Sequence, residues 1–257
     1  MVQTQGTKEW ACKNINFSKG CSNNCQYCYA RRIGNRFGWK KWNDWKNMVN
    51  RHEIGKKRFQ KANGVIMSPS SHDITLTNVK LAKKVFLHIL EAGNELLIVS
   101  KPNLKVIAEI ADFIEEYKEL VLWRFTIGTL NEKVREYWEP GAPPIINRLK
   151  SLEYLYNNDW ATSVSIEPFL DRKVVKLIKR LESFVSHTIW VGPMNKIHVP
   201  KELWTDDLTE IYSPENLLKL KYEIDNLKNL KIRYKDHFLT ILKKNGKKKK
   251  KKVLAYQ

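Results

Sequence analysis

The sequence predicts an α/β protein, an incomplete (βα)6 TIM-type barrel with parallel strands. After a cysteine-rich segment, short apolar runs of β-type residues alternate with amphipathic stretches of helical periodicity. The apolar runs lack a polar face, so their strands are expected to be covered on both sides. Five or six units of roughly 25 to 40 residues fit a partial barrel, and a doubly wound open sheet is the alternative.

The predicted strands are short and mainly aliphatic and aromatic. They cover residues 64–68, 95–100, 120–128, 160–168, 187–193 and 230–234, and a further strand lies near 11–17. The helices between them have apolar positions at three- and four-residue spacing. These positions are Val79, Ala82, Phe86, Ile89 and Leu90, then Val106, Ile107, Ile110, Ile114 and Tyr117, then Leu149, Leu152 and Tyr156, and last Val174, Val175, Ile178 and Leu181. Gly93 is placed to end the first helix, and Pro143 and Pro144 to start the third.

Parallel βα folds gather reactive groups at the carboxyl ends of the strands, where loops vary without disturbing the core. The segments at these ends are 68–73, 100–103, 126–131, 167–171 and 192–195. We expect site residues there.

The 257 residues are expected to form one domain over 1–242, with a basic and aromatic insertion at about 31–62, followed by a lysine-rich disordered tail at 243–257. Neither a long apolar run nor a signal-peptide pattern is present, which predicts a cytoplasmic protein without membrane contact. The formal net charge is +19, of which eight lysines in the tail supply 8, leaving 19 − 8 = +11. This excess suggests a polyanionic partner.

Three of the four cysteines, Cys21, Cys25 and Cys28, fall within the segment GCSNNCQYCYAR. Their spacing lets one loop hold three thiolates, and such soft ligands select zinc, copper(I) or iron-sulfur centres. One alternative is a structural zinc site with Cys12 as fourth ligand. Zinc modules usually pair two cysteine knuckles, whereas Cys12 stands alone, so the pattern favours iron-sulfur.

The order Cys-x-x-x-Cys-x-aromatic-Cys, with Tyr27 as the aromatic residue, resembles the signature of the radical S-adenosylmethionine (SAM) superfamily. The stretch from Asn14 to about Asp171 is similar to the spore photoproduct lyase branch and its photolyase-like relatives. The matching elements are SSHDI (70–74), VSKPN (99–103), TIGTLNEKVREYWEPGAP (126–143), RLKSLEYL (148–155) and SIEPFLD (165–171). The EPGAP element (139–143) is more specific to that branch than the cysteine motif.

The resemblance implies a [4Fe-4S] cluster on Cys21, Cys25 and Cys28, with the fourth iron open for SAM. In this family an electron from the cluster cleaves SAM, and the resulting 5′-deoxyadenosyl radical abstracts hydrogen from a substrate. Lyase or modification chemistry, DNA repair included, is therefore expected, together with an electron donor of flavodoxin or ferredoxin type. The protein orients the reactants and excludes water.

The resemblance also implies roles for single residues. Tyr27 is expected near the adenine of SAM, Lys101 at its carboxylate and Thr126 at its ribose. Ser70 and Ser71, with Glu167 at the end of an apolar strand, complete the expected cofactor-binding set. Tyr27, Lys101 and Thr126 also have simpler interpretations, as a core tyrosine, a solvated lysine and a β-branched strand residue, whereas the place of Glu167 at a strand end favours a site role. Pro143 and Pro144 could likewise make the segment around Glu139 a helix start.

Ser70 is a departure from the lyase pattern. The lyase uses a cysteine in this loop as hydrogen donor to its product radical, and a serine O–H bond is too strong for that role. The lyase's own repair reaction is therefore not expected. Cys12 is an alternative hydrogen donor, but its position before the cluster loop favours a structural or buried thiol.

Residues 31–61 carry eleven Lys or Arg against Asp44 and Glu53, interleaved with Trp39, Trp42 and Trp45. On a helix these tryptophans would form a loose stripe, more often a packing surface than a stacking platform. Cations beside exposed aromatics nevertheless suit a nucleic acid, which we predict as the substrate. The alternatives are a radical SAM enzyme acting on a protein or small molecule, and a non-catalytic zinc module that binds nucleic acid.

Overall fold

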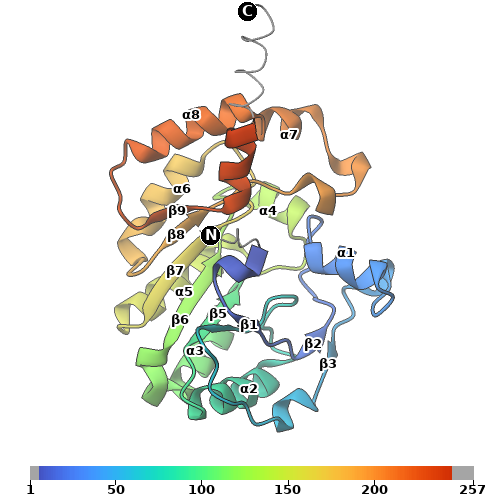
Figure 1. Ribbon diagram of the computed structural model, residues 1–257, viewed down its shortest axis with the longest axis vertical. Coiled ribbons are helices and arrows are strands. Elements are labelled where there is room, and N and C mark those ends of the chain that lie inside the picture. Colours follow the sequence, from blue (N-terminus) through green and yellow to red (C-terminus); the bar gives the residue numbers. More distant parts are fainter. Residues whose placement is uncertain (1–5, 245–257) are drawn as a thin grey trace, which may run out of the picture.

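The computed structural model describes residues 6–244, and seven strands of this range form one parallel sheet (Figure 1). The strands are β1 (Lys13–Asn14), β4 (Ile66–Met67), β5 (Leu96–Ser100), β6 (Val121–Thr126), β7 (Ala161–Ile166), β8 (Ile189–Val191) and β9 (Ile232–Tyr234). They pair in this same order, each parallel to the one before it. Because the order never reverses, the sheet lacks the switch point of a doubly wound fold. The predicted incomplete barrel is confirmed, and every predicted strand is present.

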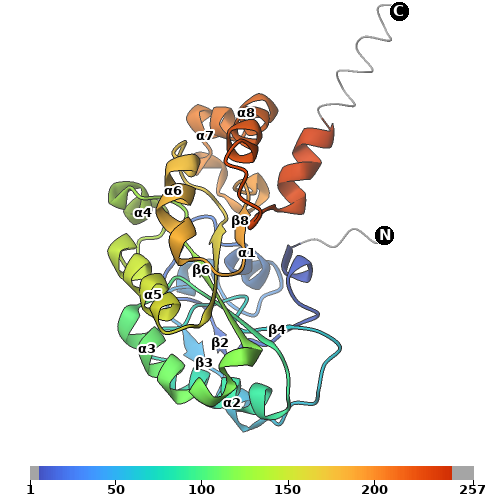
Figure 2. The ribbon, with the colours of Figure 1, turned by 90° about the vertical axis from the view of Figure 1, so that its left-hand side faces the viewer.

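Helices cover one face of the curled sheet (Figure 2). The predicted helices correspond to α2 (Val79–Glu91), α3 (Leu104–Phe113), α5 (Ile145–Asn157) and α6 (Val174–Leu181). Sequence periodicity did not predict α4 (Glu132–Trp138), α7 (Asp206–Ile211), α8 (Pro214–Asp225) or a helical segment at 236–244. The 3-10 turn η1 (Gly6–Glu9) and the segment 236–244 lie on the other, concave side of the sheet (Figure 2).

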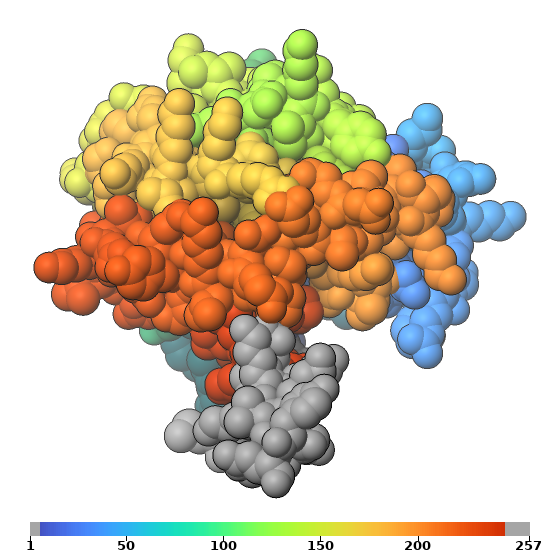
Figure 3. All heavy atoms as spheres, turned by 90° about the horizontal axis from the view of Figure 1, so that it is seen from above, coloured from blue at the N-terminus to red at the C-terminus, as the bar shows by residue number. Residues whose placement is uncertain are grey.

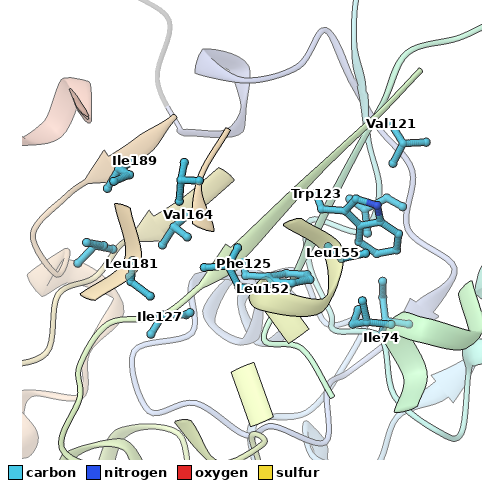
Figure 4. Close-up of a cluster of buried hydrophobic side chains, with 14 of the residues drawn as sticks. Ile74, Val121, Trp123, Phe125, Ile127, Leu152, Leu155, Val164, Leu181 and Ile189 are labelled. Atoms are coloured by element: carbon cyan, nitrogen blue, oxygen red, sulfur yellow. The ribbon is translucent and has the colours of Figure 1, made fainter. Parts of the chain in front are cut away.

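Strand β6 shows how the core fixes which side chains enter the barrel. Trp123 and Phe125 are fully buried and lie beside Leu152 and Leu155 of α5 (Figure 4). Side chains alternate along a strand, so the intervening Arg124 points to the opposite, concave face. Thr126 follows in the same alternation. The strand therefore presents Trp123 and Phe125 to the helices and Leu122, Arg124 and Thr126 to the barrel interior.

The first part of the basic segment, α1 (Tyr29–Arg36) with the turn η2 (Trp42–Asp44), projects from one side of the body (Figure 3). The chain then returns to the body through β3 (Val49–Asn50), which pairs antiparallel with β2 (Ser18–Lys19). The turn η3 (Ile54–Lys56) lies beside α2, where His88 Nδ1 is 2.9 Å from the carbonyl oxygen of Lys57. Trp39, Trp42 and Trp45 share no helix, because α1 ends before them. The remaining 3-10 turns are η4 (Glu115–Leu120), η5 (Glu182–Phe184), η6 (Lys196–His198) and η7 (Lys201–Leu203).

The predicted lysine-rich tail at 243–257 lies outside the described residues, except for Lys243 and Lys244, which end the helical segment at 236–244. Among the helices of residues 6–244, none combines the length and the apolar composition that crossing a membrane requires.

Candidate iron-sulfur and SAM site

The three cysteines of the motif lie in one loop, residues 20–28, between β2 and α1. Cys21 and Cys25 are 8% and 7% exposed, and Cys28 is half-buried. Gly20 has a φ of +82°, and a Cβ there would lie 2.5 Å from the carbonyl oxygen of Trp45, so only glycine fits. Cys28 caps α1, its Sγ accepting a hydrogen bond from the backbone N–H of Arg31 at 3.4 Å. We call residues 20–28 the cluster loop.

Burial raises the pKa of all three thiols, and that of Cys25 to about 12. Mutual repulsion adds to the effect at Cys21, since its two neighbours would also be charged. A bound metal centre reverses this preference by supplying positive charge, so the donor set suits thiolate ligation. Within residues 6–244, no three His, Cys, Asp or Glu side chains are close enough to hold a single ion, these cysteines included.

Cys12 lies at the amino ends of the strands, at the opposite end of the sheet from the cluster loop. It precedes β1, and its Sγ lies 3.3 Å from the carbonyl oxygen of Val65, just before β4. Both positions mark the amino ends of parallel strands, whereas the cluster loop lies beyond their carboxyl ends. Cys12 therefore does not complete a four-cysteine zinc shell with the motif.

Asp73, which follows β4, ties the cluster loop to the strand ends. Its carboxylate accepts hydrogen bonds from the side-chain amide of Asn23 at 2.6 Å, from the backbone N–H of Lys101 at 2.9 Å, and from the Ser100 hydroxyl. Burial raises the pKa of Asp73, and the nearby charge of Lys101 opposes that rise. The loop is thereby held over the ends of β4 and β5.

Gly141 of the EPGAP element forms the second anchor of the loop. Its N–H donates to the carbonyl oxygen of Asn23 at 3.0 Å, and a Cβ at this position would lie 2.1 Å from the carbonyl oxygen of Ser22. Gln26 extends this contact to the end of α4, because its backbone N–H donates to Trp138 O at 2.9 Å and its side-chain amide to Tyr137 O. The EPGAP element thus packs directly on the loop.

Glu139 is the centre of a buried charge network. Its side chain is 0% exposed, accepts a hydrogen bond from the Tyr27 hydroxyl, and lies 2.6 Å from Arg148 Nη2 and 3.8 Å from Lys101 Nζ. Burial alone would raise the pKa of Glu139, but Arg148 and Lys101 hold it below its usual value. Arg148 Nη1 in turn donates to the carbonyl oxygen of Thr126 at 3.2 Å. The carboxylate therefore links the cluster loop to β5, β6 and α5.

This network brings Tyr27, Lys101 and Thr126 together, as expected of neighbouring positions in one site. The Lys101 ammonium lies 5.7 Å from the Tyr27 ring centroid, and its side chain is only 15% exposed, so it is not a solvated surface lysine. Neighbouring anionic groups, Cys25 first, raise the pKa of Lys101 although burial opposes it. Their SAM-binding roles stay predictions.

Ser70 and Ser71 are held by a different residue. The side-chain oxygen of Asn16 accepts hydrogen bonds from the backbone N–H of Ser70 at 2.8 Å and of Ser71 at 2.9 Å. The Tyr29 hydroxyl, just after the last cysteine, donates to Ser70 O. The loop after β4 is thus joined to the start of α1 at the mouth of the barrel.

Glu167 follows β7 and lies in a second cluster of buried charges within the barrel. Lys235, 3% exposed, places its Nζ 3.8 Å from Glu167 Oε2, 2.9 Å from Glu9 Oε1 and 3.9 Å from the Trp10 ring centroid. Burial raises the pKa of Glu167 to about 7, and Lys235 opposes the rise. Glu9 also accepts from the backbone N–H of Asp236 at 3.1 Å. The N-terminal turn therefore crosses the concave side from β1 to β9.

Sequence reasoning missed several residues that shape the site: Asn16, Asn23, Asp73, Arg124, Arg148 and Lys235. Asp73 lay within a segment selected as a strand end, but its partner Asn23 could be recognised only after the loop was placed. The signal available for Arg148 was its place in the matched RL element, directly after EPGAP.

Residues 15–170, more than half of the chain, match the family model of the radical SAM superfamily. The chain belongs to this superfamily. A curated protein of Acidianus two-tailed virus, described as uncharacterised, is 27% identical over 251 residues, covering 86% of this chain and 81% of its own length. An uncharacterised protein of Methanocaldococcus jannaschii is 23% identical over 163 residues, covering 61% of this chain and 60% of its own.

Two solved proteins share the fold at low identity. Spore photoproduct lyase, as a mutant with bound AdoMet and dinucleoside spore photoproduct, gives a TM-score of 0.51 at 16% identity, over 72% of this chain and 58% of its own. SuiB of Streptococcus suis bound to S-adenosylmethionine gives 0.57 at 12% identity, over 89% of this chain and 52% of its own. SuiB is also solved with its precursor peptide SuiA. The chain spans a little over half the length of both proteins.

As a radical SAM enzyme, the protein uses a [4Fe-4S] cluster and SAM, and the three thiols of the cluster loop would hold the cluster. When bound, these groups supply the electron and the carbon radical of the reaction. The surrounding chain holds the loop through Asp73 and Glu139, places the Lys101 charge beside Cys25, and keeps the site shielded from water.

His72 predicts an acid sensitivity of the fold beside the cluster loop. Its Nε2 accepts from the backbone N–H groups of Phe17 and Ser18, each at 3.1 Å, and its Nδ1 faces Asp73 O at 3.0 Å, which assigns the neutral ring with the proton on Nδ1. Burial lowers its pKa to about 4. An unfolded histidine titrates near ~6.5, so the unfolded chain takes up this proton first, and stability falls between pH ~6.5 and ~4 by about 3 kcal/mol in all.

Urea unfolding of the cluster-loaded protein between pH 5 and 7.5 measures this dependence. We expect H72Q to flatten the dependence and H52Q, at an exposed histidine, to leave it intact. Parallel curves for wild type and H72Q would contradict the assignment.

Proposed function

We propose that this radical SAM enzyme abstracts hydrogen from a nucleic acid and so modifies or repairs it, in the reducing cytoplasm. The observation that carries the proposal is the outer side of α1, which begins directly after the last cluster cysteine. Tyr29, Ile33 and Phe37 are 36%, 40% and 69% exposed, and Arg32 and Arg36 are exposed among them. Cations interleaved with exposed aromatics suit a phosphate backbone with stacked bases.

The turn η6 faces α1, and we call the exposed residues of α1 and η6 together the rim. The His198 ring lies 6.1 Å from that of Tyr29, and the charge of Arg32 adds to burial in lowering the His198 pKa. Lys196 and Ile197 beside it are exposed, Ile197 at 60%. Basic and apolar groups therefore flank the barrel mouth on two sides, next to Ser70 and its Tyr29 contact.

The rest of the basic segment has a different use. Trp45 is 1% exposed and packs with Trp39, Cys21 and Ala30, while Trp42 lies 4.1 Å from the Arg31 guanidinium. Trp39 and Trp45 pack against the cluster loop and Trp42 packs on Arg31, so these tryptophans are not a base-stacking platform. The proposal therefore rests on α1 and η6 alone.

The fold does not choose the substrate, because it is shared with one protein solved with a dinucleoside lesion and another solved with a peptide. Within the site, we propose that Lys101 binds the SAM carboxylate, Thr126 its ribose and Tyr27 packs near its adenine. Ser70, Ser71 and Glu167 complete the binding set. The lyase's own repair reaction is not proposed, since Ser70 stands where that enzyme has its hydrogen-donating cysteine.

Reversing two charges on α1 tests the substrate class. We expect R32E/R36E to weaken binding of fluorescein-labelled single-stranded DNA or RNA by at least about tenfold at low salt. The magnitude of the slope of log affinity against log salt should fall by about 1.4, because each of the two lost phosphate contacts contributes ~0.7 on a single strand. Fluorescence anisotropy on the cluster-loaded, SAM-bound protein measures both quantities.

The matched control is K80E/K84E on α2, which makes the same charge change at the same helical spacing, at exposed lysines on the far side of the sheet. It should lose little affinity. Equal losses in the two variants would show that net charge alone, rather than this rim, holds the nucleic acid, and the proposal would fail.

A further inference from the structure

The electron needed for SAM cleavage must reach the cluster loop from outside the chain. Three of the four cysteines lie in that loop, and Cys12 lies at the opposite end of the strands. The point of entry is therefore a surface close to the loop itself.

The outer face of the loop is exposed, and we define it by Lys19, Ser22, Lys46, Tyr137, Pro140 and Gly141. Backbone hydrogen bonds tie the segments that carry these residues to the loop. Cys21 N–H donates to the carbonyl oxygen of Trp45 at 2.8 Å, next to Lys46, and Gly141 N–H donates to Asn23 O at 3.0 Å. Ser22 is exposed although its neighbours Cys21 and Asn23 are buried, so loop backbone alone separates this point of the face from a cluster ligand.

The chemistry of this face is apolar at one side and basic at the other. Tyr137 is 50% exposed, stands edge-on against Trp138 with ring centroids 5.0 Å apart, and adjoins the exposed Pro140 and Gly141. Lys19 and Lys46 are exposed and form no ion pair within the described range. The nearby acids are already engaged, Asp44 with Lys40 at 2.5 Å and Glu136 with Arg135 at 3.2 Å.

We infer that this outer face docks a small acidic electron-carrier protein, which packs on Tyr137 and pairs its carboxylates with Lys19 and Lys46. The carrier is oxidised by one electron and the cluster is reduced by one electron, with no bond made or broken and no atom transferred. The charge surplus attracts an acidic partner and accelerates its encounter. Membership of the superfamily supports this step, whereas the nucleic-acid proposal is independent of it.

The face is distinct from the rim proposed to bind nucleic acid. The rim begins at Tyr29, after the last cysteine, and is formed by α1 and η6, whereas the docking face lies around Ser22 at the start of the loop and at the end of α4. An electron carrier and a substrate could therefore be bound at the same time.

Charge reversal at the two lysines tests the inference through the rate of cluster reduction. The reconstituted enzyme is mixed anaerobically, without substrate, with reduced flavodoxin or reduced ferredoxin, and the loss of cluster absorbance at about 400 nm is followed by stopped flow. We expect K19E/K46E to slow reduction by about tenfold or more at low salt, and the deficit to shrink as salt screens the interaction. K19R/K46R should keep the wild-type rate, and K80E/K84E on α2 should nearly do so.

Small reductants separate docking from damage to the cluster. Dithionite and the uncharged photoreduced 5-deazariboflavin should reduce K19E/K46E and wild type at similar rates, and Y137S should lose rate only with the protein carriers. The inference would be overturned if K19E/K46E were reduced as slowly by the small reductants as by the carriers. It would also be overturned if neither carrier reduced this variant more slowly than wild type. Loss of oligonucleotide binding in K19E/K46E with carrier-driven reduction intact would overturn it too, because the face would then belong to nucleic acid.

Discussion

Replacing Cys25 with serine is expected to abolish cluster binding and, with it, all cleavage of SAM. The residue is 7% exposed and lies in the middle of the cluster loop, so its thiolate has no neighbouring substitute. A serine hydroxyl is nearly isosteric but is a hard, weakly acidic ligand that iron-sulfur centres do not favour. Loss of a supporting residue at a metal site costs about ten- to a hundredfold, and loss of a ligand should cost more.

The measurements are the absorbance at about 400 nm after anaerobic reconstitution and the yield of 5′-deoxyadenosine from SAM and reductant. C12S is the matched control, because Cys12 is exposed and its thiol makes only one weak hydrogen bond, 3.3 Å from Val65 O. It should retain full absorbance and SAM cleavage. Absorbance lost in C12S, or kept in C25S, would mean that the ligand set has been assigned wrongly.

The sheet and its covering helices could be predicted because the apolar patterns that specify them lie within short stretches of the sequence. Each strand is largely apolar, and each predicted helix shows a stripe of large aliphatic residues that the core buries, such as Leu152 and Leu155. The cysteine spacing also predicts a metal site from the local sequence, since one loop brings three thiols within eight residues.

The short helices could not be predicted on the same grounds. Helix α4 spans only Glu132–Trp138 and buries just Arg135 and Trp138, too few positions to show a period. It forms because Asn131 caps it and because its last carbonyls accept from Gln26 of the cluster loop, a contact over more than a hundred residues. Tertiary contacts of this kind leave no mark in local sequence.

Buried charged side chains were the second feature that could not be predicted from the sequence. Arg148 is 1% exposed, Lys235 3% and Arg124 3%, although arginine and lysine are ordinarily surface residues. Each is buried against a carboxylate or an indole ring, and for Arg124 and Lys235 a distant segment contributes the ring of Trp10. Hydropathy therefore places these residues on the outside, where they would have no role in the site.

Replacing Glu139 with glutamine is expected to destabilise the protein by about 3 kcal/mol and to lower SAM cleavage about ten- to a hundredfold. Glutamine keeps the shape but removes the charge, leaving the buried Arg148 guanidinium and the Lys101 ammonium without their counter-ion. The Tyr27 hydroxyl loses its charged acceptor at the same time, so the cluster loop is less firmly held. Urea unfolding and the yield of 5′-deoxyadenosine measure the two effects. E136Q, one turn away on an exposed side chain paired with Arg135, should change stability by less than about 0.5 kcal/mol.

The double variant E139Q/R148M decides whether the ion pair itself is responsible. Breaking one partner of a buried pair strands the other charge, whereas removing both charges eliminates that penalty. The double variant should therefore be more stable than the sum of the single losses predicts, by at least about 1 kcal/mol. SAM cleavage should not recover with it, because Tyr27 and Lys101 would still lack the carboxylate that positions them. Simple additivity of the stability losses would mean that Glu139 acts through Tyr27 and Lys101 alone, while recovered SAM cleavage would mean that the carboxylate serves only to neutralise Arg148.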